Sequence, residues 1–362
     1  FINYIRVWTK TTLEISTPGR ICLFGEHQDY LGLPIIAMAI SLRSYIKGEK
    51  VENQQVTIHK PDLNDSESFS LDNLDYDCQR DYYKSGIKIC LNEGLSFSHG
   101  FNCEVSSNIP FQAGTSSSSA IMVSWVHFLS RMADEPADWD LNKIAEVSYK
   151  AETLEFEEPG GMMDQYTTSI GDFIYLESNS GILVDKINPE LGTFVLGDSL
   201  QPKDTIGILS RCKDSRLEII KKLEFRNPGI DFQSCNADHD LTNLDEDEKE
   251  LYFGTIRNKE ILNQALVELK KDKIDHGMIG RLLNDHQSVL RNILRISTDK
   301  VDNMINAALN AGAYGGKING SGGGGCMFAY APENPERVAE AIEDAGGKSY
   351  IICSDQGTRI EK

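Results

Sequence analysis

The sequence predicts a two-domain α+β protein, and three observations support this prediction. The 362 residues are 40% hydrophobic, so the chain can fill two cores or one large core. Short strand-like runs dominate its beginning, and helical periodicity follows them. The last part mixes long helices with short strands, as expected for helices packed on a small sheet. We expect the domains to cover residues 1–197 and 198–362, without a long linker or an internal repeat.

The first part of the chain contains apolar or alternating runs bounded by turn residues. These runs predict strands at residues 13–16, 20–24, 33–40, 51–59 and 101–105. Helices are then expected at about residues 117–132 and 141–156, with a break at Pro136 between them. Another helix is expected to begin near Met162, after the turn at Gly160 and Gly161.

The second part alternates between apolar runs and longer periodic segments. Strands are predicted at residues 173–176, 182–184, 205–209, 314–319, 326–330 and 349–353. Helices are expected to dominate from residue 217, notably over residues 261–269, 279–294, 301–311 and 335–345.

Composition restricts the possible partners and the cellular location. The 36 basic and 55 acidic residues give a net charge of −19, which argues against nucleic acid or an anionic membrane as a partner. No apolar run approaches the roughly 20 residues of a membrane span, and residues 1–10 lack a signal-peptide pattern. The eight cysteines form no C-x-x-C pair, which suits reduced thiols. We therefore expect a cytoplasmic protein. The sequence does not predict its oligomeric state.

A loop of small polar residues leads directly into a predicted helix. Residues 108–120 read Asn-Ile-Pro-Phe-Gln-Ala-Gly-Thr-Ser-Ser-Ser-Ser-Ala, and an apolar periodic segment follows. The start of a helix has unpaired N–H groups and partial positive charge, so this loop could hold phosphate oxygens. Its serine hydroxyls add donors, and any of them could bind Mg²⁺. A serine-rich helix cap is the alternative.

A second segment places polar side chains around a single apolar strand. Arg20 lies within the predicted strand, and Glu26, His27, Gln28 and Asp29 follow it. Carboxylates and a histidine at the end of a strand suit the hydroxyls of a sugar. An ordinary polar surface turn would explain the same residues.

Two acidic residues flank the Gly-Gly turn. Glu152 lies on the helix before the turn, and Asp164 follows the turn among apolar neighbours. One carboxylate could hold Mg²⁺ while the other faces a substrate hydroxyl, as phosphoryl transfer requires. Alternatively, Glu152 is a solvated acid on the helix surface and Asp164 is a helix cap.

A glycine-rich segment near the C-terminus indicates a loop that approaches another group closely. Residues 315–326 contain seven glycines and are followed by an apolar strand. Residues 320–325 match G-x-G-x-x-G, but a strand follows where that motif requires a helix. There is no Walker A motif either. Neither common nucleotide fold is therefore indicated, and a loop at a functional site is favoured over a flexible linker.

These four segments, in this order, resemble the GHMP kinase superfamily. Its phosphate loop, Pro-x-x-x-Gly-Leu-x-Ser-Ser-Ala, is matched by Pro110, Gly114, Ser117 and Ser118. The segment from Gly19 to Tyr30 is most similar to the galactokinase signature. The resemblance implies an N-terminal domain like ribosomal protein S5 domain 2 and a C-terminal ferredoxin-like α/β sandwich. The active site would lie in the cleft between these domains.

The resemblance also implies roles for individual residues. Asp164 would act as the base or orienter, and Arg20 would stabilise negative charge beside it. The acceptor would contact Glu26, His27, Asp29 and Gly161. The ATP phosphates would lie on Gly114, Thr115, Ser116, Ser117 and Ser118, and Ser118 and Glu152 would bind Mg²⁺.

The implied activity is transfer of the γ-phosphate of ATP to the anomeric hydroxyl of a hexose, with galactose as the first expectation. The chain also departs from galactokinases. Gln28 replaces a threonine, the segment from Ile206 to Arg216 lacks a tyrosine, and Lys317-Ile318-Asn319 is closer to mevalonate kinases. Another sugar, a heptose phosphate or mevalonate therefore remains an alternative acceptor. A regulator that binds sugar and ATP without catalysis is a further alternative.

Overall fold

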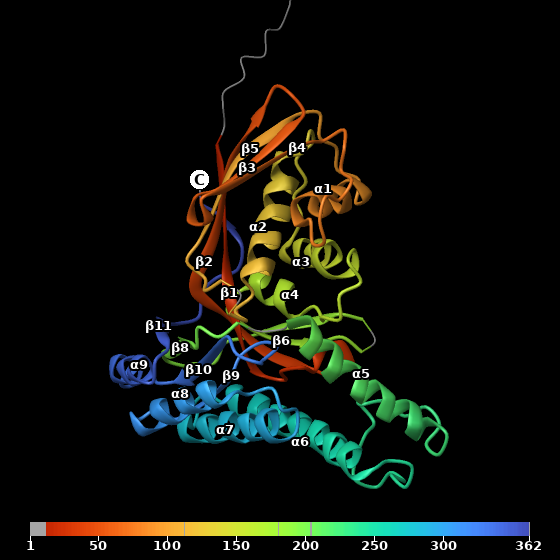
Figure 1. Ribbon diagram of the computed structural model, residues 1–362, viewed down its shortest axis with the longest axis vertical. Coiled ribbons are helices and arrows are strands. Elements are labelled where there is room, and N and C mark those ends of the chain that lie inside the picture. The colour runs from red at the N-terminus through yellow and green to blue at the C-terminus, as the bar shows by residue number, and fades with distance from the viewer. Residues whose placement is uncertain (1–11, 112, 180, 203–204, 362) are drawn as a thin grey trace, which may run out of the picture.

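Two β-sheets organise the molecule (Figure 1). The computed structural model describes residues 12–111, 113–179, 181–202 and 205–361. The larger sheet has eight strands, in the order β12-β1-β2-β5-β3-β4, with β6 on β2 and β7 on β6. The smaller sheet has four strands, in the order β11-β8-β10-β9. Helices pack on both sheets, so the predicted α+β class is confirmed.

The larger sheet is built on two long antiparallel strands. β1 pairs with β2 from Leu13↔Gly48 to Phe24↔Ile36, and the register shifts between Pro18 and Gly19. The runs predicted as two strands around this point therefore form one irregular strand. The strands of this sheet are β1 (Leu13–Phe24), β2 (Ile35–Val51), β3 (Gln55–Lys60), β4 (Asp65–Ser70), β5 (Gly100–Ser107), β6 (Phe173–Glu177), β7 (Leu183–Ile187) and β12 (Arg359–Ile360).

Four helices gather on one face of the larger sheet (Figure 1). They are α1 (Tyr82–Asn92), α2 (Ser117–Met132), α3 (Leu141–Tyr149) and α4 (Met163–Ile170). Trp125 and Phe128 of α2 are fully buried and pack against Phe101 of β5. The predicted helix at residues 117–132 is thus confirmed. The helix predicted at about residues 141–156 is confirmed as far as Leu154, but its last part, η3 (Lys150–Leu154), is π-helical.

The smaller sheet lies below the larger one in Figure 1 and has its own helices. Its strands are β8 (Phe194–Asp198), β9 (Gly315–Ile318), β10 (Cys326–Tyr330) and β11 (Lys348–Ile352). The helices of this half are α5 (Thr205–Glu224), α6 (Glu246–Leu269), α7 (His276–Asn292), α8 (Asp299–Asn310) and α9 (Pro335–Asp344). Two short 3-10 turns, η1 (Asp29–Leu31) and η2 (Pro61–Leu63), belong to the first half of the chain.

The strand predicted at residues 205–209 is wrong, because these residues form the first turn and a half of α5. A short apolar run does not distinguish a strand from a helix by periodicity alone. The helix exposes both Ile206 and Leu217 in part, so its apolar stripe is weak. That weak stripe explains why the sequence pattern failed here.

The strand pairing divides the chain slightly before the expected position. The predicted division at residues 197 and 198 falls inside β8, and the whole of β8 pairs with β10 and β11. Near the end of the chain, Ile360 of β12 pairs with Ile15 of β1 in the larger sheet. The second sheet therefore begins at Phe194, and the final strand returns to the first sheet.

None of the helices in the described part of the chain is long and apolar enough to cross a membrane. Residues 1–10, for which the sequence indicated no signal-peptide pattern, lie outside the described residues.

Candidate active site

The loop at residues 108–120, called here the serine loop, lies directly against the glycine-rich loop at residues 315–326. The carbonyl oxygen of Gly114 accepts hydrogen bonds from Arg20 Nη1 at 2.5 Å and from Asn319 Nδ2 at 2.8 Å. A Cβ atom on Gly320 would lie 2.7 Å from this same oxygen, and Gly320 has a φ of 77°. Glycine is therefore required at position 320, both for its backbone conformation and for the close approach of the two loops.

Ser116 ends the serine loop in a left-handed conformation, with a φ of 61°, and caps α2. Its hydroxyl is buried and has no hydrogen-bond partner among the described residues. Ser117 and Ser118 begin the helix, while Thr115 is buried beneath them and its carbonyl oxygen accepts from Arg20 N. A helix start with an unpartnered hydroxyl fits a phosphate group, because phosphate oxygens accept such bonds.

Arg20 and Asp164 form an ion pair beside this loop. Arg20 Nη2 and Nε lie 2.6 and 2.8 Å from Asp164 Oδ1. The Arg20 side chain is 4% exposed, whereas that of Asp164 is 29% exposed, so solvent or a substrate can reach the carboxylate. Burial lowers the pKa of Arg20, but the charges of Asp164 and Glu26 outweigh it and leave this pKa above its usual value.

Asp29 and Gly161 are in contact on the other side of Asp164. Met163 N donates to Asp29 Oδ2 at 3.1 Å. A Cβ atom on Gly161 would lie 1.9 Å from the same oxygen, so the loop requires glycine there. Burial, with a smaller contribution from the charge of Asp164, raises the pKa of Asp29 to about 6.

Glu26 binds the glycine-rich loop with both of its carboxylate oxygens. Oε2 pairs with Lys317 Nζ at 2.6 Å, and Oε1 accepts from Gly320 N at 2.9 Å. The side chains of Glu26 and Lys317 are 2% and 0% exposed. The predicted acceptor contact at Glu26 would have to compete with these bonds.

His27 is likewise held on both ring nitrogens. Nε2 lies 3.0 Å from the carbonyl oxygen of Ser321, which can only accept, so Nε2 carries the proton. Nδ1 then accepts from the Tyr30 hydroxyl at 2.7 Å, and Tyr30 accepts from Arg216 Nη2 at 2.6 Å. Burial, with the charge of Arg216 next in size, lowers the pKa of His27 to about 3. His27 is therefore neutral and links the glycine-rich loop to α5.

Glu152 lies in η3, facing the start of α2. Gln165 Nε2 donates to Glu152 Oε2 at 2.6 Å, and the hydroxyls of Ser118 and Ser119 also hydrogen-bond to this carboxylate. Burial raises the pKa of Glu152 to about 7, although these hydrogen bonds lower it.

This donor set fits Mg²⁺. Carboxylate and hydroxyl oxygens are the hard ligands that Mg²⁺ prefers, and Mg²⁺ usually needs only one or two carboxylates when nucleotide phosphates complete its shell. The part of the chain that the structure describes contains no group of three or more His, Cys, Asp or Glu residues able to hold a metal by themselves. Ser118 and Glu152 would be the residues of this chain that hold the ion.

Sequence reasoning identified the four segments but missed several of the residues that join them. These are Lys317 and Asn319 on the C-terminal side, Gln165 after Asp164, and Arg216 on α5. Asn319 Oδ1 accepts from Cys22 N at 2.9 Å, and Lys317 Nζ donates to Cys22 O at 2.9 Å. Polar residues bordering a glycine-rich loop were the available signal, but their partners almost 300 residues away were not evident from the sequence.

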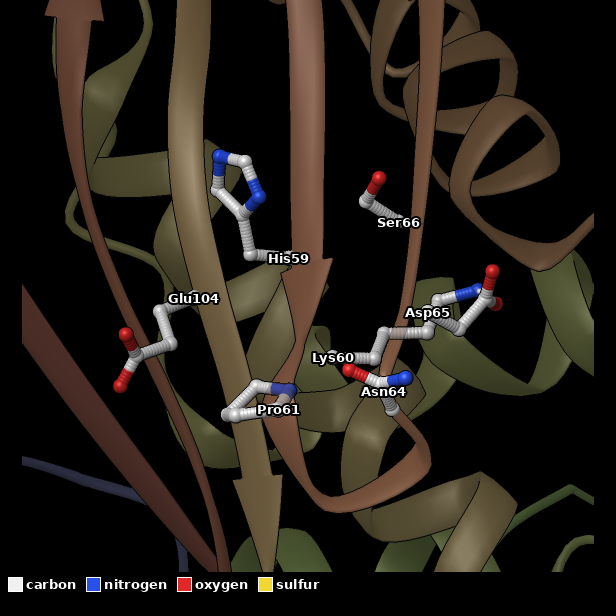
Figure 2. A pocket seen from close by; sticks show the side chains of 7 residues that line it. All are labelled: His59, Lys60, Pro61, Asn64, Asp65, Ser66 and Glu104. Atoms are coloured by element: carbon white, nitrogen blue, oxygen red, sulfur yellow. Dashed lines mark hydrogen bonds and ion pairs between the residues drawn. The ribbon is translucent and has the colours of Figure 1, made fainter.

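A separate surface hollow lies at the turn between β3 and β4, beside β5, and Figure 2 shows its side chains. It is lined by His59, Lys60, Pro61, Asn64, Asp65, Ser66 and Glu104. None of the candidate site residues lines this hollow.

Three family models match this chain. The GHMP kinases N terminal domain matches residues 81–172, the GHMP kinases C terminal model matches residues 263–348, and the galactokinase galactose-binding signature matches residues 9–50.

Similar proteins cover almost the whole chain. A mevalonate kinase of Thermococcus gammatolerans is 30% identical and covers 96% of this chain and 98% of its own. A galactokinase of Pyrococcus furiosus is 25% identical, with 94% of each chain covered. The structure of Lactococcus lactis galactokinase complexed with galactose superposes with a TM-score of 0.83 at 21% identity, over 97% of this chain and 95% of that one.

The two-domain fold, the paired loops and these matches agree with one another. The chain belongs to the GHMP kinases, a family of ATP-dependent phosphotransferases.

Proposed function

We propose that this kinase transfers the γ-phosphate of ATP to the anomeric hydroxyl of a hexose, with galactose as the first candidate. The observation that carries the proposal is the Arg20–Asp164 pair, whose carboxylate is 29% exposed next to the serine loop. A partly exposed carboxylate beside a phosphate-binding loop can receive the proton of an acceptor hydroxyl.

In the proposed reaction, Asp164 orients the acceptor hydroxyl and takes its proton. The acceptor oxygen forms a bond to the γ-phosphorus as the bond from that phosphorus to the β–γ bridging oxygen breaks. ADP leaves with the electron pair, and Asp164 later returns its proton to solvent. Arg20 stabilises the negative charge that develops in between. Gly114, Thr115, Ser116, Ser117 and Ser118 would hold the phosphates through N–H and hydroxyl groups.

Mg²⁺, when bound, would neutralise negative charge on the ATP phosphates. Ser118 and Glu152 would hold it, because these oxygen donors already meet at the start of α2.

The six buried cysteines are all free thiols, which supports a reducing compartment such as the cytoplasm.

The choice of a sugar rests on the acceptor side of the site. Asp29 and Gly161 lie together beside Asp164, and a carboxylate next to a partly exposed loop backbone suits ring hydroxyls. The match of residues 9–50 to the galactose-binding signature supports the same choice. Because Glu26 and His27 hold the glycine-rich loop, we propose that they shape the acceptor site in addition to any direct contact.

Mevalonate is the second candidate acceptor. A mevalonate kinase is 30% identical to this chain, which is higher than the 25% identity of the P. furiosus galactokinase.

An ADP-release assay with galactose, other hexoses, a heptose phosphate and mevalonate tests the proposal. We expect turnover with a hexose and phosphate ester formation at C1, detected by NMR. Asp164→Asn should lower kcat by at least about 1000-fold while ATP binding persists. The exposed Asp272→Asn is the matched control. Preferred turnover of mevalonate would refute the hexose proposal, and binding of sugar and ATP without turnover would indicate a regulator.

A further inference from the structure

We propose that the hexose acceptor carries an anionic substituent, a carboxylate or a phosphate, which binds Lys213 of α5 and is attracted by the charge of the buried Arg216 on the same helix. This inference rests on the proposed sugar kinase function and specifies its acceptor class. The relevant place is the side of Tyr30 that faces α5, immediately after the acceptor-side residue Asp29.

The first observation is a buried arginine without an acidic partner. Arg216 is 0% exposed, and its guanidinium donates from Nε to Cys212 O at 2.7 Å and from Nη2 to the Tyr30 hydroxyl at 2.6 Å. Its Nη1 is buried and makes no hydrogen bond within the described chain. A buried charge normally has an ion partner, because removing it from water is costly. Arg216 thus leaves positive charge and an unused donor directly behind Tyr30.

The second observation is a second cation on the same side of Tyr30. Lys213 Nζ lies 5.9 Å from the centre of the Tyr30 ring, and the Arg216 guanidinium carbon lies 5.5 Å from it. Lys213 Nζ also donates to Pro159 O, at the long distance of 3.5 Å. Pro159 belongs to the loop that carries Gly161, so this ammonium lies at the border of the acceptor side. Lys213 is only half-buried, so a ligand can reach it.

The charges around the site are arranged unequally. At the reacting end, Arg20 is paired with Asp164, and nearby Lys317 is paired with Glu26. At the α5 end, neither Lys213 nor Arg216 has an ion pair with any described acidic residue. Burial is the main cause that lowers the pKa of His27, and the charges of Arg216, Lys317 and Arg211 lower it further. In a chain with a net charge of −19, such an unpaired cationic end is unexpected without an anionic ligand.

The arrangement therefore fits an acceptor with two different ends. Its anomeric hydroxyl would face Asp164, and its acidic group would face Lys213, with the Arg216 charge behind. A hexose uronate or a hexose 6-phosphate has this form, because its charged group is at C6, which is attached to C5 and separated from C1 by the ring oxygen. A neutral hexose would leave both cations without a counter-charge.

The test compares three acceptors that differ only at C6: galactose, galacturonate and galactose 6-phosphate. We measure kcat/KM for each with the full chain and with Lys213→Met, Lys213→Arg and Lys221→Met. Lys221 is an exposed residue of the same helix and is the matched control. We expect at least one anionic acceptor to exceed galactose at least about tenfold in kcat/KM. Lys213→Met should lower the kcat/KM of the anionic acceptor relative to that of galactose about tenfold, through KM more than kcat. Lys213→Arg should retain most of this preference.

We also expect the kcat/KM of the anionic acceptor to fall more steeply with added salt than that of galactose, because salt screens charge attraction. The carboxylate and phosphate arms identify which anion the site takes. Turnover of galactose equal to or better than both anionic acceptors would overturn the inference and leave the sugar kinase proposal intact. An equal loss for all three acceptors in Lys213→Met would also overturn it. Absence of turnover with every sugar would instead refute the proposed function itself.

Discussion

Asp29 is a buried carboxylate that accepts a backbone hydrogen bond from the first residue of α4. Its Oδ2 accepts from Met163 N at 3.1 Å, and Asp164 and Glu26 add negative charge nearby. Burial raises its pKa from the usual 3.8 to about 6. The folded protein therefore favours protonated Asp29 more than the unfolded chain does.

This raised pKa predicts a pH dependence of stability. Between pH 3.8 and about 6, Asp29 is ionised in the unfolded chain but stays protonated in the folded protein. The free energy of unfolding should therefore fall as the pH rises through this range. The fall attributable to Asp29 is about 3 kcal/mol and is complete above the folded pKa. Urea titrations of the wild type and Asp29→Asn at several pH values measure it as a difference. A difference that stays constant from pH 4 to pH 7 would contradict the assignment.

Gln165 contacts the proposed metal ligand directly. Its Nε2 lies 2.6 Å from Glu152 Oε2, and its own Oε1 is buried without a described partner. Gln165→Met removes the hydrogen bond that orients the Glu152 carboxylate. We therefore expect the Mg²⁺ concentration that gives half-maximal activity to rise about tenfold, with a smaller change in kcat. Mn²⁺ binding in the presence of ATP, followed by electron paramagnetic resonance, measures the same loss without turnover. Unchanged Mn²⁺ affinity would show that Gln165 has only a packing role.

The sequence predicted which segments carry the site better than it predicted what each side chain contacts. Arg20 and Asp164 were expected together, and the structure pairs them. Glu26 and His27 were expected on the acceptor, but their partners lie on Gly320, Lys317 and Ser321. No local pattern encodes a contact across almost 300 residues, because such contacts depend on how the two sheets meet.

The loop between η3 and α4 shows how an element positions the site. Gly160 and Gly161 are adjacent, yet their surroundings differ sharply. A Cβ atom on Gly161 would lie 1.9 Å from Asp29 Oδ2, while a Cβ atom on Gly160 would have Thr153 Cγ2 at 3.9 Å as its nearest neighbour. Only the second glycine is required for contact with the acceptor side.

These two glycines form a matched pair of variants. Gly161→Ala should displace Asp29 or the loop and raise the KM for the acceptor at least about tenfold. Gly160→Ala places its methyl group in ordinary van der Waals contact with Thr153, so its KM should remain within about twofold of the wild type. Steady-state kinetics of both variants, with circular dichroism to confirm folding, make the comparison. Equal KM values for the two variants would exclude the proposed role of Gly161.

Among the helices and strands, strongly periodic segments were predictable from the sequence and short ones were not. The bounds of α2 agree with the predicted residues 117–132, since a serine-rich start and a continuous apolar stripe define that helix. The helix at α5 was predicted to begin as a strand, because residues 205–209 form a short apolar run, which periodicity alone does not assign to a strand or a helix. The π-helical η3 was also not expected. Periodicity does not report a change in hydrogen-bond pattern that leaves the helix direction unchanged.

The two halves of the molecule are joined through buried polar contacts at β1. Lys317 and Asn319 border the glycine-rich loop, and both bind the backbone at Cys22. Lys317 also pairs with Glu26, with both side chains excluded from solvent. The order of strands and helices in the sequence indicated two units. It did not indicate that a buried ion pair, with one partner in each half, would join them.

This buried pair predicts how the whole molecule responds to its removal. Lys317→Met leaves the Glu26 carboxylate buried without its cation, which should lower the free energy of unfolding by about 3–5 kcal/mol. The double variant Glu26→Gln with Lys317→Met leaves no unpaired charge, so it should be more stable than Lys317→Met alone. Lys249→Met is the control, because Lys249 pairs with Glu246 at an exposed position and should cost at most about 1 kcal/mol. Urea unfolding of all four proteins, monitored separately in each half by a fluorescent label, measures these differences. If the double variant is less stable than Lys317→Met, the contact joins the halves through packing and hydrogen bonds to Gly320 N rather than through charge compensation.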